Sequence, residues 1–336
     1  MRTNDFPIDI VIPWVDGEDE NWLKEKNRFS DQVTSSVHDY NYKDWGLLKY
    51  WFRSIEKNAP WVRTIYFITC GQVPAWMDVS RNSKLKLVFH EEFIPLEYLP
   101  TFSSHTIELN IHRLPGLAEH FIYFNDDMYL IRKASRELFF YKGLPCDTAI
   151  INPIAPQSRN VISHLMLTNI AIINEHFSKT QVIEKDLFKW FNPKYGRYNL
   201  LSLMFAPWRR FPGLYEQHLP TSFLKSTFEE VWSKEYTILD QTCKRRFRDF
   251  KLDVNQWLMK DWQIAEGMFT PRSVYAGRAF SVRDLNDAEQ VAKVLSKRKY
   301  KMVCINDHVE EGVEDISNCI KDAFEREYPD KSSFEK

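Results

Sequence analysis

Acidic and amide side chains follow three of the predicted strands, at the points where the apolar runs end. Runs 11–15, 121–124 and 302–305 lead into Asp16, into Asn125-Asp126-Asp127 and into Asn306-Asp307. In open α/β sheets, ligands bind just outside the carboxyl ends of the strands, so we expect these side chains to meet in one crevice. Asp and Asn also cap turns and helices, and this alternative stays open at each single position.

The pair Asp126 and Asp127 indicates a cation or diphosphate site. Adjacent carboxylates at the end of a buried strand repel each other unless a cation or hydrogen-bond donors compensate. Oxygen ligands suit a hard ion such as Mg²⁺ or Mn²⁺, which also contacts substrate phosphates. The predicted metal ligands are Asp126, Asp127, Asn306 and Asp307.

Two of the nine histidines are candidates for a general base, because an imidazole titrates near neutral pH. His218 lies in a Pro-punctuated loop, and loops often carry catalytic groups. His105 opens a predicted helix, where it would contact substrate or only satisfy the helix end. Their spacing alone does not decide between them.

The run 244–248 is the densest basic segment. Guanidinium groups grip phosphate oxygens in a bidentate fashion, although a charge run also serves as a solvated helix face. In a chain of nearly zero net charge, a local basic cluster beside acidic strand ends suits a nucleotide-diphosphate enzyme. We favour Arg248, the last residue of the run, as the phosphate ligand.

The elements that position these residues are predicted from the apolar pattern. Short runs rich in Ile, Val, Phe and Tyr indicate buried strands at 8–15, 64–69, 85–89, 121–124, 148–151 and 302–305. Helical patterns separate them, for example one that Asp44 caps and that ends before Pro60. Strands that alternate with helices predict an α/β fold with a mainly parallel sheet and flanking helices.

The middle of the chain differs, since from about 158 to 269 helical signals dominate and no strand is predicted. We expect a helix at 222–232 there and another that Asp253 caps. The final part returns to a strand at 301–305, expected to join the first sheet, and ends in a frayed tail at 331–336.

This pattern predicts three parts. They are an α/β core at 1–157, a helical insertion or lid carrying the candidate base at 158–270, and a return to the core sheet with a C-terminal helix at 271–330.

Composition excludes several classes of protein. The 336 residues are 44% hydrophobic and 15% aromatic, which is typical of an ordered globular protein. A net charge of -1 gives no broad attraction to nucleic acid. The five cysteines lack a paired spacing, and Cys304 is expected to be a buried, reduced thiol without chemistry. No apolar run approaches the roughly 18 residues that cross a bilayer, so we expect a protein of cytosolic type.

Four blocks of the sequence resemble the stealth family, which includes bacterial capsular polysaccharide phosphotransferases and the N-acetylglucosamine-1-phosphotransferase that tags lysosomal enzymes. The matching blocks are 8–17, then 48–63 with 71–74, 99–102 and 121–127, then 218–220, and finally 305–307. Together they span nearly the whole chain. The family members that tag lysosomal enzymes have Asn where this chain has Asp16, which argues against a metal-ligand role for Asp16.

The resemblance implies roles for individual residues. Asp127 and His218 fall on catalytic positions, and Arg248 falls near a phosphate-binding arginine, with Arg245 and Arg246 competing for the same place. The residues assigned to substrate binding are Asp16, Gly17, Arg53, His105, Asn125 and Arg246. The expected fold is a nucleotide-diphosphosugar-transferase-like core with a helical insertion.

The resemblance also implies the reaction, which is transfer of a hexose- or N-acetylhexosamine-1-phosphate from a UDP-sugar to a hydroxyl of a polysaccharide or glycolipid acceptor, with release of UMP. The alternatives are a metal-dependent glycosyltransferase that releases UDP, and a non-catalytic carbohydrate-binding module. The expected setting is bacterial capsule or exopolysaccharide synthesis, in the cytoplasm or peripherally at the inner face of the plasma membrane beside membrane-bound machinery.

Overall fold

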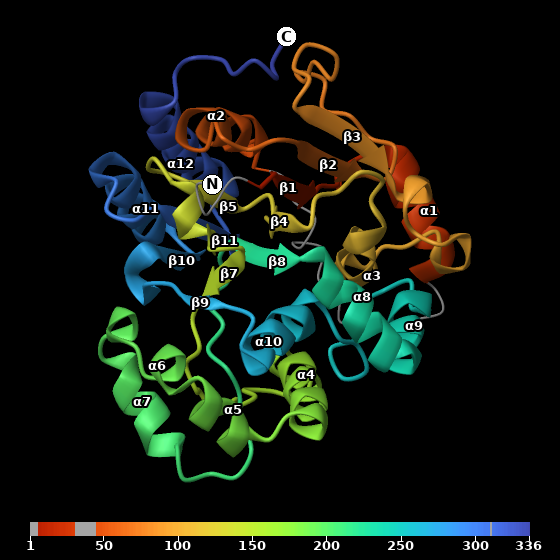
Figure 1. Ribbon diagram of the computed structural model, residues 1–336. Helices are drawn as coiled ribbons and strands as arrows, with labels where there is room; N and C mark the ends of the chain where they lie inside the picture. Colours follow the sequence, from red (N-terminus) through yellow and green to blue (C-terminus); the bar gives the residue numbers. More distant parts are fainter. Residues whose placement is uncertain (1–5, 31–44, 310) are drawn as a thin grey trace.

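A five-stranded sheet in the order β3-β2-β1-β4-β8 forms the centre of the computed structural model, which describes residues 6–30, 45–309 and 311–336 (Figure 1). Its strands are β1 (Ile8–Pro13), β2 (Ile65–Thr69), β3 (Leu85–Phe89), β4 (His120–Tyr123) and β8 (Thr221–Leu224). The first four pair in parallel, and β8 pairs antiparallel with β4 at the edge. The predicted α/β class with a mainly parallel sheet is confirmed.

Two smaller sheets extend this centre. One contains β10 (Gly277–Val282), β11 (Met302–Asp307) and β5 (Met128–Leu130), and the other contains β6 (Phe140–Tyr141), β7 (Leu144–Asp147) and β9 (Thr270–Pro271). The expectation that the last strand joins the first sheet is therefore wrong. The chain leaves β4, turns at 124–127 and continues as β5, and β11 pairs antiparallel with β5 rather than with a strand of the main sheet.

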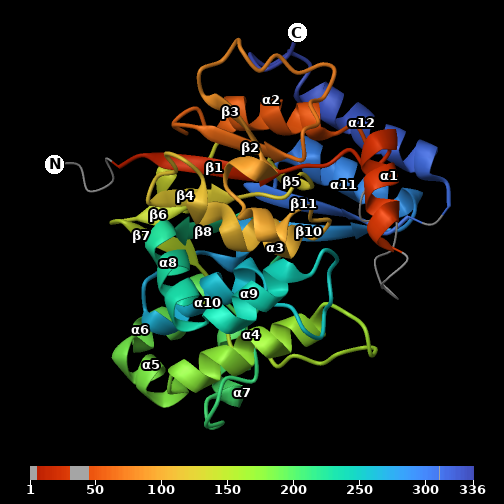
Figure 2. The ribbon, with the colours of Figure 1, turned by 90° about the vertical axis from the view of Figure 1, so that its right-hand side faces the viewer.

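Helices cover both faces of the main sheet and form a lobe below it (Figures 1 and 2). They are α1 (Glu20–Ser30), α2 (Leu48–Asn58), α3 (Ser104–Asn110), α4 (Ser163–His176), α5 (Lys179–Lys185), α6 (Leu187–Trp190), α7 (Tyr198–Phe205), α8 (Lys225–Lys234), α9 (Tyr236–Lys244), α10 (Gln256–Glu266), α11 (Leu285–Lys297) and α12 (Val313–Glu327). Among the described residues, no helix combines the length and the apolar character that crossing a membrane requires.

The alternation of side chains along β1 explains why the sheet is covered on both faces. Ile8, Ile10 and Ile12 pack into one core with residues of α2, α11 and α12, whereas Val11 packs into a second core with residues of α3, α8 and α10. A strand buried on both faces reads as a continuous apolar run, which is the pattern that predicted it.

The middle segment is helical as expected, with α4 to α10, but it also contains the strand β8. The absence of any strand between 158 and 269 was therefore a wrong prediction, and the helix expected at 222–232 is α8, which begins only at Lys225. Periodicity does not distinguish a buried four-residue strand from a helical turn. β8 adds the middle segment to the main sheet, while the boundaries 158–270 and the role of a lid stay predictions.

Residues 148–151 do not form a strand, contrary to the prediction. Side chains satisfy their backbone N–H groups: Tyr195 accepts from Ala149, and Ser202 accepts from Ile151. Only Ile151 forms an isolated bridge, with Leu214. Because these groups already have partners, no neighbouring strand is needed.

The helix cap expected at Asp253 is wrong. Asp253 does not cap α10; the cap is Asn255, whose side chain accepts from the Trp257 backbone N–H. The carboxylate of Asp253 instead pairs with His105 and Arg245. Asp44 lies outside the described residues.

The C-terminal segment is not a frayed tail, because its side chains are buried against α2. Phe334 is buried and contacts the ring of Phe52. Arg53 donates two hydrogen bonds of 2.8 Å to the carboxylate of Glu335 and a third to the Tyr328 carbonyl. This buried ion pair also corrects the assignment of Arg53 to substrate binding, since its guanidinium holds the chain end.

Replacing Glu335 with alanine should lower the free energy of unfolding by about 3–5 kcal/mol, because it leaves Arg53 buried without its main partner. Urea unfolding followed by circular dichroism measures the change. The matched control is Lys331→Ala, which removes an exposed side chain from the same segment. Equal, small effects of the two substitutions would show that the segment is frayed.

Candidate active site

Two of the three acid-terminated strands meet at one place, although they belong to different sheets. The backbone N–H of Ile305 on β11 donates to the carbonyl of Asp127 at 2.9 Å, so the end of β11 lies beside the turn after β4. The third strand, β1, reaches the same region through Trp14 and Val15. Asp16 itself accepts the N–H of Glu18 within its own turn, which is the alternative capping role.

A pocket of about 390 Å³ opens at this meeting point. Its polar lining comes from segments far apart in the sequence and includes His90, Thr101, Ser104, His105, Glu108, Asn125, Asp126, Asp127, His218, Arg248, Asn255, Gln256, Asn306, Asp307 and His308. Aromatic side chains complete it, among them Trp14, Trp45, Phe102, Tyr129 and Trp257. An acidic end, a single arginine and aromatic walls in one cleft suit a charged ligand that carries a ring.

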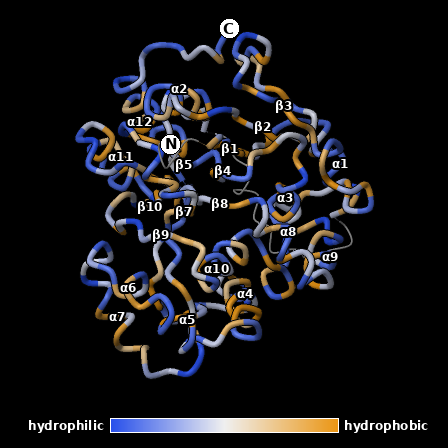
Figure 3. Tube along the Cα trace, in the orientation of Figure 1, coloured by the Kyte–Doolittle hydropathy of each residue, from blue (hydrophilic) through white to orange (hydrophobic). Residues whose placement is uncertain are grey.

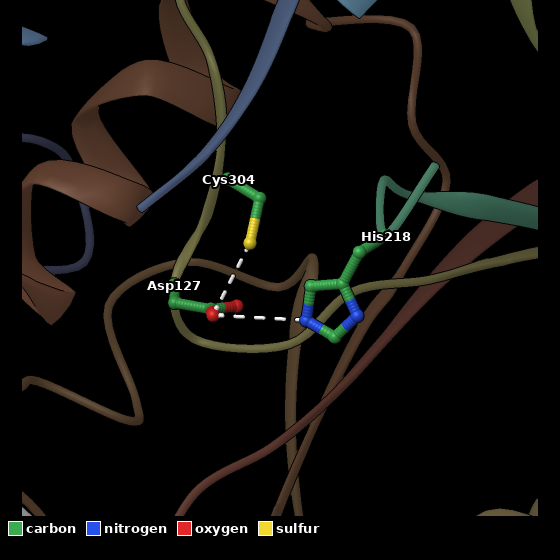
Figure 4. A group of neighbouring side chains, drawn as sticks. All are labelled: Asp127, His218 and Cys304. Atoms are coloured by element: carbon green, nitrogen blue, oxygen red, sulfur yellow. Dashed lines mark hydrogen bonds and ion pairs between the residues drawn. The ribbon is translucent and has the colours of Figure 1, made fainter. Parts of the chain in front are cut away.

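Asp127, His218 and Cys304 form the most compact polar group in the pocket (Figure 4). Oδ2 of Asp127 lies 3.2 Å from Sγ of Cys304 and 3.9 Å from Nε2 of His218. The potential ligand atoms of the three residues all lie within 4.8 Å of one another, so the group could hold a metal ion. Each residue comes from a different segment: the turn after β4, the loop before β8, and β11.

Burial raises the pKa of two of these side chains, Asp127 and Cys304. It raises the pKa of the Asp127 carboxyl, an effect that the nearby His218 opposes. Burial, followed by the neighbouring Asp127 carboxylate, raises the pKa of the Cys304 thiol well above its usual range. The thiol therefore stays protonated and acts as the hydrogen-bond donor to Asp127.

Cys304 is the functional candidate that the sequence analysis missed. It is a buried, free thiol as predicted, but it contacts Asp127 and donates to Oδ1 of Asn306 at 3.4 Å. Residues two apart on a strand face the same side. Since Asn306 was already a site candidate, that spacing was the signal that could have found Cys304.

The backbone of His218 adopts a left-handed conformation, with a φ of 50°. Such a φ is uncommon outside glycine, and its cost of about 1–3 kcal/mol persists only where the surroundings enforce it. Glu216 accepts the N–H of His218 at 3.1 Å, and the edge of the imidazole meets the ring of Trp257. The loop thus holds the imidazole toward Asp127.

Buried charges brace this loop on both sides of His218. The carboxylate of Glu216 forms an ion pair with Lys260, which is almost completely buried. Two residues after His218, the carbonyl of Pro220 accepts from Arg272, which also lies 3.9 Å from Asp147. The position of the imidazole therefore depends on charge pairs in the interior.

Replacing Lys260 with methionine should cost about 3–5 kcal/mol of unfolding free energy, because it leaves the Glu216 carboxylate partly buried and unpaired. Turnover should fall as well, since Glu216 orients His218. The double variant Lys260→Met/Glu216→Gln should recover most of the stability. Lys234→Met, which breaks an exposed pair with Glu230, is the control and should cost less than about 1 kcal/mol. A similar effect at both lysines would contradict a bracing role.

The basic run separates into one pocket residue and three structural ones. Lys244 pairs with Asp240, and Arg245 pairs with Asp253. Arg246 donates to the Pro100 carbonyl, stacks over Phe29 and is not among the residues that line the pocket. Arg248 lines the pocket, and its Nε is buried without a hydrogen-bond partner among the described residues. An unpartnered donor there is available to an anionic ligand.

Of the other residues assigned to substrate binding, some line the pocket and some do not. His105 and Asn125 line the pocket, whereas Asp16 and Gly17 lie just outside it. Nδ1 of His105 is fixed at 3.0 Å from the buried Asp253 carboxylate. His105 is 3% exposed and His218 is 33% exposed, so His218 is the more accessible of the two predicted general bases.

All four predicted metal ligands line the pocket, and two of them have free oxygens. Oδ1 of Asp127 and Oδ2 of Asp307 are buried without a hydrogen-bond partner within residues 6–30, 45–309 and 311–336. Unpaired buried carboxylate oxygens are costly, and a cation would satisfy them. These two oxygens are therefore candidate ligands for a divalent ion. Among the described residues, Asp127 lies within 4.8 Å of ligand atoms of His218 and Cys304, and it does not form such a group with Asp126 and Asp307.

Three regions of the chain match models of one protein family. Models of stealth protein conserved regions 1, 2 and 4 match residues 6–34, 41–146 and 292–336. Asp127 and Asp307 lie inside these regions, and His218 and Arg248 lie between them.

Three relatives illustrate the similarity. A capsular polysaccharide phosphotransferase WcwK of Streptococcus pneumoniae is 41% identical and covers 98% of both chains. The exopolysaccharide phosphotransferase cps2G of Lactiplantibacillus plantarum is 38% identical over 98% of this chain and 97% of its own. The receptor polysaccharide phosphotransferase WefC of Streptococcus oralis is 40% identical over 98% of this chain and 99% of its own.

Among solved structures, the galactosyltransferase LgtC in complex with donor and acceptor sugar analogs covers 94% of this chain and 95% of its own. Its TM-score is 0.38 at 10% identity. A likeness at that level carries no argument about the site.

Proposed function

The chain belongs to the stealth family, and from this premise we propose that it transfers a sugar-1-phosphate from a UDP-sugar to a hydroxyl of a polysaccharide or glycolipid acceptor and releases UMP. It is a transferase, and its relatives named above are bacterial polysaccharide phosphotransferases. The observation that carries the proposal is the convergence of Asp127, His218 and Arg248 on one pocket from three separate segments.

In this reaction His218 takes the proton of the acceptor hydroxyl, and the oxygen attacks the sugar-linked phosphorus. The bond from that phosphorus to the bridging oxygen of UMP breaks, while the anomeric bond of the sugar stays intact. Positioning and charge stabilisation supply most of the acceleration in such transfers. The fixed His218 backbone and its contact with Trp257 support the positioning.

Charge on the leaving phosphate is stabilised by Arg248, whose buried Nε has no hydrogen-bond partner in the described part of the chain. Asp126, Asp127, Asn306 and Asp307 would hold Mg²⁺ or Mn²⁺, because hard ions prefer oxygen ligands. Such an ion would neutralise the diphosphate oxygens. The chain's own contribution is to aim carboxylate oxygens and one guanidinium at the same cleft.

The donor class is tested by incubating the protein with a panel of UDP-sugars, Mg²⁺ and an acceptor polysaccharide, and measuring the released nucleotide by mass. We expect UMP. Release of UDP would identify a glycosyltransferase, and no turnover with retained sugar binding would identify a carbohydrate-binding module. Excess chelator should stop the reaction and Mg²⁺ or Mn²⁺ should restore it, whereas full activity in chelator would remove the ion from the mechanism.

Replacing Arg248 with lysine should lower kcat/KM for the donor by about 10²-fold, because lysine keeps the charge but loses the bidentate fork. Steady-state kinetics over a range of donor concentrations measures the loss. Lys244→Ala is the control from the same run and should change kcat/KM little, since Lys244 is exposed and pairs with Asp240. Equal, mild effects would place Arg248 on a solvated face.

A further inference from the structure

Exposed, large apolar side chains that do not line the pocket lie on α6, α7 and the turn after α7. Phe188 is 84% exposed, Met204 70% and Trp208 55%. We define the 187–208 surface by its exposed large apolar side chains, which are Leu187, Phe188, Leu200, Leu203, Met204 and Trp208. Contiguous exposed apolar surface of this kind marks an interaction site more often than scattered single residues do.

Three of these side chains lie on one face of α7. Leu200, Leu203 and Met204 are spaced three and four residues apart on α7, which places them on the same side of the helix. Asn199 donates to the carbonyl of Asn192 and so ties the start of α7 to the end of α6. α6 and α7 lie at the end of the molecule opposite β3 (Figures 1 and 2), and α7 shows apolar segments (Figure 3).

A buried lysine holds the most exposed turn of this surface in place. Lys179 is 1% exposed. Its ammonium donates to the carbonyls of Phe205, Ala206 and Trp208 at 2.7 to 2.8 Å. Two of these bonds go to carbonyls at the C-terminal end of α7, those of Phe205 and the C-cap Ala206, and the third goes to the turn that follows. Trp208 therefore projects outward from a fixed turn.

The segment that forms this surface carries basic side chains and no acidic ones. Lys194, Arg197, Arg209 and Arg210 are exposed, and the sequence has no Asp or Glu from 187 to 210. Within the described parts of the chain, none of these four cations forms an ion pair. The whole chain carries a net charge of only -1, so this local excess is not a general property of the protein.

We propose that the 187–208 surface binds the surface of an anionic lipid bilayer. Exposed Trp, Phe and Leu side chains inserted at the headgroup level, with Lys and Arg beside them, are the chemistry of interfacial membrane binding. A second copy of the chain fits less well, because a two-fold contact would bring the same cations together from both copies.

Cosedimentation of the full chain with vesicles tests the proposal. We expect binding to vesicles of phosphatidylglycerol and phosphatidylcholine, little binding to phosphatidylcholine alone, and loss of binding at high salt. Leu203→Glu/Met204→Glu should weaken binding by about ten-fold or more. Each basic residue near such a surface contributes about five-fold, so Arg197→Glu/Arg209→Glu should weaken binding by at least about 25-fold.

The controls are exposed residues elsewhere, Leu96→Glu/Leu285→Glu for the apolar pair and Lys297→Glu/Lys299→Glu for the charged pair. Both control variants should bind as the wild type does, and circular dichroism should show that all variants fold. Equal losses in control and test variants, or no binding to anionic vesicles, would overturn the proposal. So would a dimer in sedimentation that Leu203→Glu/Met204→Glu dissociates without any vesicle binding. None of these readouts depends on the transfer reaction.

Discussion

The Asp127→Asn variant is expected to lose at least about 10²–10³-fold in turnover while it stays folded. The substitution keeps the size of the side chain but removes the charge that faces His218 and the acidic end of the pocket. If Asp127 also binds the divalent ion, the ion is lost together with it. Turnover with the donor identified above, and the concentration of Mg²⁺ needed for half activity, measure both effects.

The stability of this variant separates a functional role from a structural one. Burial raises the pKa of Asp127 above its value in the unfolded chain, so the charged form of this carboxyl is less favourable in the native state than in the unfolded chain. The favourable contribution of such a group is present at acidic pH and is lost as the pH rises through the folded pKa. At neutral pH the neutral asparagine should therefore leave the unfolding free energy unchanged or higher.

Asp16→Asn is the matched control for Asp127→Asn. Asparagine retains the side-chain oxygen that accepts the Glu18 N–H, and Asp16 lies outside the pocket. We expect this variant to keep most of its activity. Unfolding of Asp127→Asn, or activity equal to that of Asp16→Asn, would assign Asp127 to a capping role.

Replacing His218 is expected to slow turnover by about 10²–10⁴-fold, the usual contribution of a general base, with little change in donor binding. The left-handed backbone at this residue affects the choice of substitution. Alanine would add strain of its own, whereas asparagine adopts this conformation readily. His218→Asn thus removes the proton acceptor with the least disturbance of the loop, and His218→Gln offers a second amide that cannot take up a proton.

Kinetics with each variant, together with binding of the intact donor, test this role. His105→Ala is the comparison, and it should mainly lower stability because His105 pairs with the buried Asp253. If either amide variant turned over at close to the wild-type rate, the base would have to be another residue. A loss of donor binding equal to the loss of turnover would instead indicate that His218 only shapes the pocket.

Local pattern was sufficient for much of the fold. The apolar runs that became β1, β2, β4 and β11 are nearly continuous because these strands are largely buried. The acidic and amide residues at their ends were recognisable because parallel strands place the residues that follow them at one edge of the sheet. The ordered motifs also identified the family, which needs only the sequence.

Tertiary structure decided every point that depended on a partner distant in the sequence. Arg53 is an ion-pair residue because Glu335 folds back onto α2, and Arg248 is the pocket arginine because Asp253 and Pro100 occupy its neighbours. Neither fact is encoded in local spacing.

The same reason explains the second sheet and Cys304. β11 pairs with β5 instead of the main sheet, and this pairing brings a thiol that looked inert against Asp127. The sequence by itself determined which residue types stand at the ends of the strands. Which of them face one another followed only from long-range pairing, because a contact between segments depends on how the whole chain packs rather than on the residues near each one.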